Sequence, residues 1–120
     1  MNSPVIDEVI AERARQEARW GEQNHPCIPI KPSLRNIREL SARYDIPTPF
    51  EAQRRCEQYR EQGRMTWGDV LVEEVCEAVI EMDPAERRKE LIQVAAVAIA
   101  WAESMDRNGR VVTDGAQEEA

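Results

Sequence analysis

A chain of 120 residues is long enough for one domain with one hydrophobic core. Its net charge of −7 argues against a general nucleic-acid-binding protein, because such proteins usually present a basic surface. The longest apolar run, Leu91–Ala102, contains Gln93 and is too short to cross a bilayer, so no membrane partner is expected either. The odd number of cysteines, with no CxxC pair among them, is typical of reduced thiols and indicates a cytoplasmic protein.

The composition favours an all-α chain. Glycine is scarce, the prolines lie mostly between helical stretches, and no segment shows the alternation of apolar and polar residues that is typical of a strand. The sequence therefore predicts an all-α helical bundle over residues 1–107. A loose acidic tail is expected over residues 108–120.

The first predicted helix begins after Ser3 and ends near Trp20, with Pro4 at its first position. Arg13 and Glu17 interrupt its apolar face one turn apart. One interpretation of this pair is a local ion pair at the rim of the helix. The other is that Arg13 binds a phosphate or orients a carboxylate, since the guanidinium group suits both tasks by its bidentate geometry.

A loop is predicted over residues 21–33, because three prolines in this stretch exclude a helix or a central strand. The polar run at its start is a candidate for part of a base or sugar pocket, in which Trp20 would stack and Asn24 would pair. His25 is the only histidine, and a lone histidine in a loop is more often solvated than catalytic. Together with Arg13, these three side chains are the candidate substrate-binding residues.

Two shorter helices are expected next. Ser33 is predicted to cap a helix that ends near Tyr44. Thr48 and Glu51 have the spacing of a capping box, so another helix begins there and continues until Gly63 stops it. Because the helix that follows Thr48 carries many charges and few apolar side chains, we expect it to be peripheral or to lie at a subunit boundary.

The segment Thr66–Trp101 is predicted to form the core of the bundle as two antiparallel helices, over about residues 69–82 and about residues 84–106. The short join between them makes the two helices packed neighbours. Both helices begin with the pattern of a capping box, formed by Thr66 with Asp69 and by Asp83 with Glu86.

A narrow acidic stripe follows one side of each core helix. The first helix carries Glu73, Glu74, Glu77 and Glu81, and the second carries Glu86, Glu90 and Gln93. If the two stripes face each other, their oxygen atoms converge inside a helical core. Carboxylates so close together cannot all stay ionised unless they share protons or hold a cation, and such clusters are typical ligands of Mg²⁺. A solvated acidic ridge is the alternative interpretation.

The acidic motif resembles the EExxE…ExxD signature of the MazG-like family of all-α nucleoside triphosphate pyrophosphohydrolases. It reads Glu73-Glu74-Val75-Cys76-Glu77, followed by Glu90-Leu91-Ile92-Gln93. The runs ERARQEARWGEQNHP, TWGDVLVEEVCEA and KELIQVAAVAIAW are similar, in the same order, to small phage and bacterial members. The resemblance covers about residues 8–106. Gln93 departs from the family's aspartate and supplies an amide oxygen without a charge.

This resemblance implies a bundle of the all-α NTP pyrophosphatase type. It implies an enzyme dependent on Mg²⁺, with Mn²⁺ as the other candidate ion, that converts an NTP or dNTP and water into the monophosphate and pyrophosphate. The implied metal ligands are Glu73, Glu74, Glu77, Glu90 and Gln93. Gln93 would bind weakly or through a water, Glu73 is alternatively the base that orients the attacking water, and Glu77 is expected to be essential for turnover.

Other interpretations stay open at this point. The chain is alternatively a catalytically silent scaffold that dimerises and binds a nucleotide or a protein partner, or a member of the phosphoribosyl-ATP pyrophosphohydrolase branch of the same superfamily. A homodimer or a dimer of dimers is expected, because the second core helix is apolar nearly all round. Several basic side chains are candidates for binding phosphate, namely Arg87, Arg88, Lys89 and Arg107.

Overall fold

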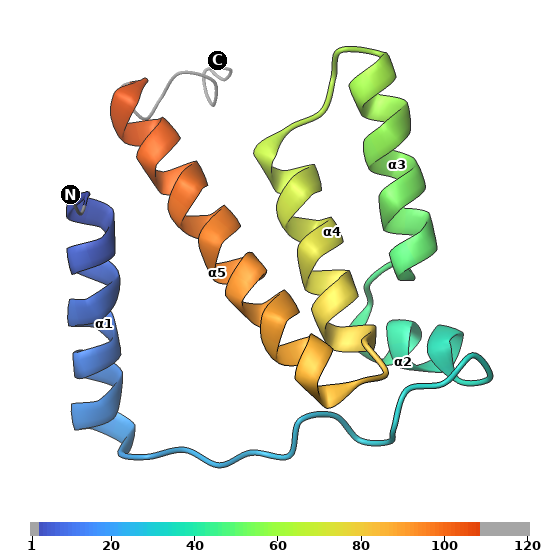
Figure 1. Cartoon of the computed structure of the whole chain (residues 1–120), viewed down its shortest axis with the longest axis horizontal. Coiled ribbons are helices and arrows are strands. Elements are labelled where there is room, and N and C mark those ends of the chain that lie inside the picture. Colours follow the sequence, from blue (N-terminus) through green and yellow to red (C-terminus); the bar gives the residue numbers. More distant parts are fainter. Residues whose placement is uncertain (1–2, 109–120) are drawn as a thin grey trace. The chain divides into compact units, whose positions relative to one another are not determined.

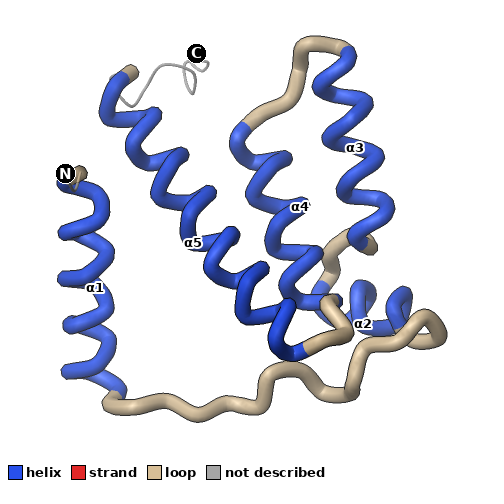
Figure 2. Tube along the Cα trace, in the orientation of Figure 1, coloured by secondary structure: helices blue, strands red, loops and turns tan. Residues whose placement is uncertain are grey.

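The computed structural model describes residues 3–108, and within them the chain is helical with no strand (Figure 2). The five helices are α1 Pro4–Trp20, α2 Ile37–Tyr44, α3 Pro49–Glu61, α4 Trp67–Ile80 and α5 Pro84–Arg107 (Figure 1). This all-α structure confirms the predicted fold class. The tail that was predicted to be loose lies, apart from Asn108, outside the described residues.

The chain divides into two compact units. Of the described residues, 3–27 and 99–108 form the first unit, and 28–98 form the second. Helix α5 therefore contributes to both units. None of the described helices combines the length and the apolar character that crossing a membrane would require.

In the first unit, α1 has the predicted start and end. Pro4 occupies its first turn and Ser3 is its N-cap residue, but the Ser3 hydroxyl makes no capping hydrogen bond and is buried without a partner among the described residues. At the other end, the backbone N–H of Gly21 donates to the Glu17 carbonyl while Gly21 adopts a φ of 68°. Most side chains of α1 are exposed, and Val5 is its buried residue.

The second unit is built on the antiparallel pair α3 and α4, which lie side by side (Figure 1). Helix α2 packs against α4 as well. The side chains buried in this unit are mostly small, which lets the helices approach closely. They include Leu40 of α2, Ala52 and Cys56 of α3, and Cys76, Ala78 and Ile80 of α4. Helix α3 was expected to be peripheral, and it does keep most of its charged side chains exposed while its small residues pack on α4.

Both helices of this pair begin with the predicted capping box. The Thr48 hydroxyl accepts from the Glu51 N–H at 3.2 Å, and the Glu51 carboxylate accepts from the Thr48 N–H at 3.0 Å. Thr66 and Asp69 make the same exchange at 3.2 Å and 2.9 Å. Each pair satisfies two N–H groups that a helix N-terminus leaves without intrahelical partners.

The start of α2 differs from the prediction, and α5 starts where predicted but without the predicted capping box. Helix α2 has Asn36 as its N-cap residue rather than Ser33, because the Asn36 side chain accepts from the Ser33 N–H at 2.8 Å and holds residues 33–36 in a turn. At α5, Asp83 does cap, through the N–H of Ala85 at 3.0 Å. No capping box forms there, because the Asp83 N–H donates to Glu81 at 3.2 Å and Glu86 pairs with Lys89 at 3.2 Å.

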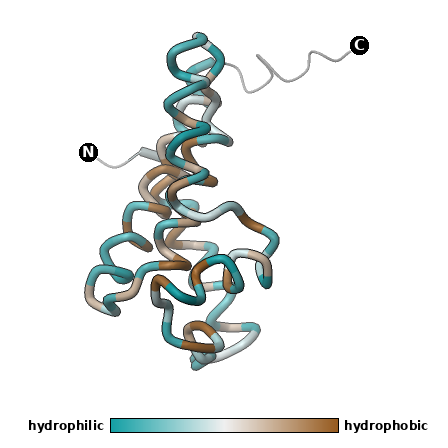
Figure 3. Tube along the Cα trace, turned by 90° about the vertical axis from the view of Figure 1, so that its right-hand side faces the viewer, coloured by the Kyte–Doolittle hydropathy of each residue, from teal (hydrophilic) through white to brown (hydrophobic). Residues whose placement is uncertain are grey.

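Hydrophobic and hydrophilic residues are interleaved along the helices (Figure 3). The prediction that α4 and α5 pack together as the core of the bundle is wrong. Among the described residues α4 packs on α3 and α2, and α5 has no buried side chain although it carries the longest apolar run. Leu91 and Ile92 of α5 are 52% and 57% exposed. An apolar helix surface of this kind is available for contact with another element or another chain.

Candidate functional site

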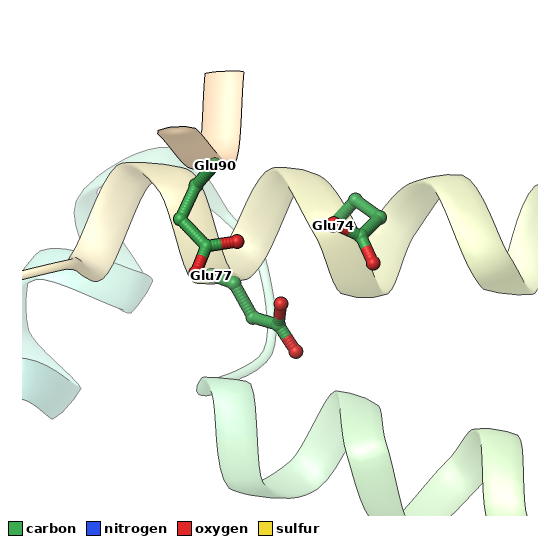
Figure 4. Close-up of side chains that lie close together, drawn as sticks. All are labelled: Glu74, Glu77 and Glu90. Atoms are coloured by element: carbon green, nitrogen blue, oxygen red, sulfur yellow. The ribbon is translucent and has the colours of Figure 1, made fainter. Parts of the chain in front are cut away.

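The junction between α4 and α5 positions three glutamates. Glu74 and Glu77 lie one turn apart on the same side of α4, and Glu90 reaches toward them from α5 (Figure 4). One carboxylate oxygen of each residue lies within 4.8 Å of an oxygen of the other two. The three belong to the same unit of the chain, and the short link over residues 81–83 brings the helices together at this end.

Each of these glutamates is half-buried, and two of their oxygens lack a hydrogen-bond partner. Glu74 Oε1 and Glu90 Oε1 are both shielded from solvent, and neither has a donor among the described residues. Buried polar atoms are nearly always hydrogen-bonded, because leaving one without a partner costs about 1–3 kcal/mol. Either a proton or a cation could satisfy these oxygens.

The electrostatics of the cluster favour protonation when no cation is present. Burial, together with the charges of Glu74, Glu73 and Glu90, raises the pKa of Glu77 from 4.5 to about 7. Burial and the charge of Glu90 also raise the pKa of Glu74. Both shifts have the same two causes: burial leaves a negative charge poorly solvated, and the neighbouring carboxylates repel it.

An apolar hollow adjoins the cluster. It has a volume of about 250 Å³, and its lining residues are Ile37, Pro49, Glu77, Ile80, Glu81, Met82 and Glu90. Two of the three clustered carboxylates therefore also line this hollow, while the rest of its wall is mostly apolar. Apart from Glu90 of α5, the wall comes from α2, the start of α3, the end of α4 and the link that follows α4. Nothing in the sequence indicated that α2 and α3 would contribute to the site.

The remaining acidic candidates lie outside the three-oxygen cluster. Burial raises the pKa of the Cys56 thiol to about 11, and the nearby Glu73 carboxylate adds to this rise, as its charge also does for Glu77. Glu81 and Glu86 make the local contacts at the start of α5 already described. Gln93 is exposed on α5, one turn beyond Glu90. Of the residues in the two predicted stripes, only Glu74, Glu77 and Glu90 converge in the described part of the chain.

The candidate substrate-binding residues belong to the first unit, whereas the cluster belongs to the second. All four are exposed and their contacts are local. Arg13 donates to Gln16 at 2.7 Å and lies 3.9 Å from the Glu17 carboxylate, as the ion-pair interpretation predicted. The Arg19 guanidinium lies 4.6 Å from the centre of a Trp20 ring. Asn24 donates to Glu22 at 3.2 Å, and His25 is solvent-exposed.

Sequence reasoning also missed a contact that joins α5 to the end of α4. Arg87, in the first turn of α5, donates to the backbone carbonyls of Ala78 and Glu81 at the end of α4. The sequence suggested Arg87 only as one of several possible phosphate-binding residues. Its separation from the end of α4 by a short link was the available signal, since such an arginine can reach the last carbonyls of the preceding helix.

Chemically, the cluster offers a set of hard oxygen ligands without any nitrogen or sulfur. Such a set suits Mg²⁺ or Mn²⁺ better than zinc, which favours histidine and cysteine. The two buried oxygens without partners are consistent with that use. Comparisons with protein families, with curated proteins and with solved structures found no match to this chain.

Proposed function

We propose that this chain is a Mg²⁺-dependent nucleoside triphosphate pyrophosphohydrolase. The proposed reaction takes an NTP or dNTP and one water, breaks the bond between the α- and β-phosphates, and yields the monophosphate and pyrophosphate. The observation that carries the proposal is the convergence of Glu74, Glu77 and Glu90, with two buried oxygens that have no partner. The MazG-like spacing of the same residues supports it.

Glu74, Glu77 and Glu90 would hold the metal ion, with Mn²⁺ able to replace Mg²⁺. When bound, the ion supplies charge neutralisation for the phosphates and lowers the pKa of a coordinated water. Glu77 must lose its proton to act as a ligand, and its pKa of about 7 makes that loss easy near neutral pH. Metal affinity should therefore rise between about pH 6 and pH 8.

Glu73 is the proposed general base that orients and deprotonates the attacking water. It lies beside Glu77 at the edge of the cluster, and it is more suited to this task than to metal binding because its oxygens are not among the converging ones. Gln93, exposed on the next turn of α5, is proposed to act through a water rather than directly.

The hollow beside Glu77 and Glu90 is the proposed place for the nucleoside part of the substrate. The apolar side chains of Ile37, Pro49 and Met82 can contact the flat face of a base or the sugar. Strong selection among bases requires polar groups that would be left unpaired by the wrong base. This lining offers carboxylate acceptors and no side-chain donor, so we expect all four bases to be accepted with small differences.

A homodimer or a dimer of dimers is proposed as the working form. The exposed Leu91 and Ile92 on α5 support this, because a second chain would remove both from water.

The second candidate is a silent scaffold that binds a nucleotide or a partner without turnover. The neutral Gln93 favours it, because this chain then has four carboxylates where the EExxE…ExxD signature has five. Gln93→Asp addresses this directly, since a gain of turnover in that variant would show the wild-type site to be limited at this position.

The deciding experiment measures pyrophosphate release from the eight common NTPs and dNTPs with Mg²⁺, with Mn²⁺ and with EDTA. We expect metal-dependent release that Glu77→Gln abolishes. Glu86→Gln is the matched control, because Glu86 is exposed and paired with Lys89 away from the cluster. Nucleotide binding without release, from a folded protein, would instead establish the scaffold.

A further inference from the structure

Arg87 makes the side-chain contacts that tie the start of α5 to the end of α4. Its Nε donates to the Ala78 carbonyl at 3.2 Å, and one of its terminal nitrogens donates to the Glu81 carbonyl. The side chain is half-buried. By contrast, the side chain of the neighbouring Arg88 is exposed and makes no hydrogen bond or ion pair among the described residues.

The contact has a clear physical reason. The last carbonyls of a helix lack partners within the helix and carry a partial negative charge. Ala78 and Glu81 lie at this end of α4, which ends at Ile80 and has Glu81 as its C-cap residue. A guanidinium group can both donate hydrogen bonds to these carbonyls and offset their partial negative charge. It is permanently charged, and its planar array of N–H groups can reach two carbonyls.

The contact lies within one helical turn of the carboxylates that converge from the two helices. Ala78 directly follows Glu77 on α4, and Glu90 follows Arg87 by three residues on α5. The peptide link over residues 81–83 keeps the helix ends close. The two bonds from Arg87 add a second attachment, and together the attachments restrict where the Glu90 carboxylate can lie.

We propose that Arg87 is a positioning residue for the glutamate cluster, holding α5 against the end of α4 so that Glu90 meets Glu74 and Glu77. Arg87 does not bind phosphate in this proposal, because its guanidinium is already engaged with backbone carbonyls. The positioning of α5 stands on these two hydrogen bonds alone, and the effect on metal binding rests on the proposed function.

The first test measures helix geometry without any metal. Spin labels are attached through Val72→Cys on α4 and Ala96→Cys on α5, both exposed positions of the same unit, after the exposed Cys27 is changed to serine. The distance distribution between the labels is compared in wild type, Arg87→Met and the matched control Arg88→Met. We expect Arg87→Met to broaden or displace the distribution and Arg88→Met to leave it unchanged. An unchanged distribution in Arg87→Met would overturn the proposal.

The second test titrates the native-cysteine protein with Mn²⁺. Losing a residue that orients metal ligands typically weakens metal affinity by about 10–100-fold, and we expect a loss in this range for Arg87→Met with none for Arg88→Met. Arg87→Lys should recover part of the affinity, because an ammonium group can still donate to one of the two carbonyls. Arg87→Lys also provides a testable variant if Arg87→Met fails to fold. Far-ultraviolet circular dichroism would reveal such a failure.

The two tests separate the possible failures. If wild type binds no Mn²⁺ but Arg87→Met still changes the label distances, the proposed metal function fails and the positioning role of Arg87 stands. If wild type binds Mn²⁺ and Arg87→Met binds it equally well, Arg87 does not position the ligands and the proposal is wrong.

Discussion

Replacing Glu77 with glutamine is expected to stabilise the metal-free protein at pH 8 and to change its stability little at pH 5. The folded protein holds the Glu77 proton with a pKa of about 7, whereas the ordinary value is 4.5. The folded state therefore binds more protons than the unfolded state between these two values. The free energy of unfolding consequently falls as the pH rises through this window, and the loss is complete above about pH 7.

The magnitude follows from the difference between the two pKa values. At 1.36 kcal/mol per pH unit, it corresponds to about 3 kcal/mol of destabilisation by the ionised Glu77. Because the carboxylate keeps some contact with solvent, screening reduces this, and we expect about 1–3 kcal/mol. Glutamine cannot ionise, so Glu77→Gln should recover most of this free energy at pH 8.

The assay is urea unfolding of both proteins at pH 5 and pH 8, with EDTA present to remove metal ions. Glu86→Gln serves as the control, because Glu86 is exposed and its ion pair with Lys89 is local. A difference between Glu77→Gln and wild type that is the same at both pH values would refute the reasoning. So would a Glu77→Gln variant that is less stable than wild type at pH 8.

Three further outcomes are expected. Mg²⁺ at about 100 times its dissociation constant should raise the free energy of unfolding by about 2.7 kcal/mol at pH 8, and Glu90→Gln should remove most of this gain in the same urea assay. A thiol reagent should modify the exposed Cys27 first and reach Cys56 and Cys76 only on unfolding, because both are buried and each has a pKa raised to about 11; equal rates for the three thiols would contradict this. Thr48→Ala and Thr66→Ala should each cost about 1 kcal/mol in thermal unfolding, whereas Ser3→Ala should cost much less because the Ser3 hydroxyl makes no capping bond.

The helices were predictable because their signals are local. Both capping boxes depend on residues three positions apart, and both formed as the sequence indicated. The errors arose where two local partners competed. Asn36 displaced Ser33 at the start of α2, and Lys89 drew Glu86 away from the start of α5.

The site was predictable only in part. Glu74 and Glu77 share a helix face by their spacing, and the short link to α5 predicted that Glu90 would lie near them. Glu73 is rotated by about 100° from Glu74 on the same helix, which explains why it stays outside the converging set. The contribution of Ile37 and Pro49 to the hollow could not be foreseen, since it depends on how α2 and the start of α3 pack on α4.

The packing of α3 on α4 has a consequence for the order of folding events. These helices are neighbours in the chain, each begins with its own capping box, and their contacts are local, which favours early formation. Helix α5, with no buried side chain, is expected to dock later and to bring Glu90 to the cluster only then. Repulsion among the glutamates would thus act after the folding barrier. In stopped-flow measurements on metal-free protein, raising the pH from 5 to 8 should speed unfolding and leave the folding rate nearly unchanged.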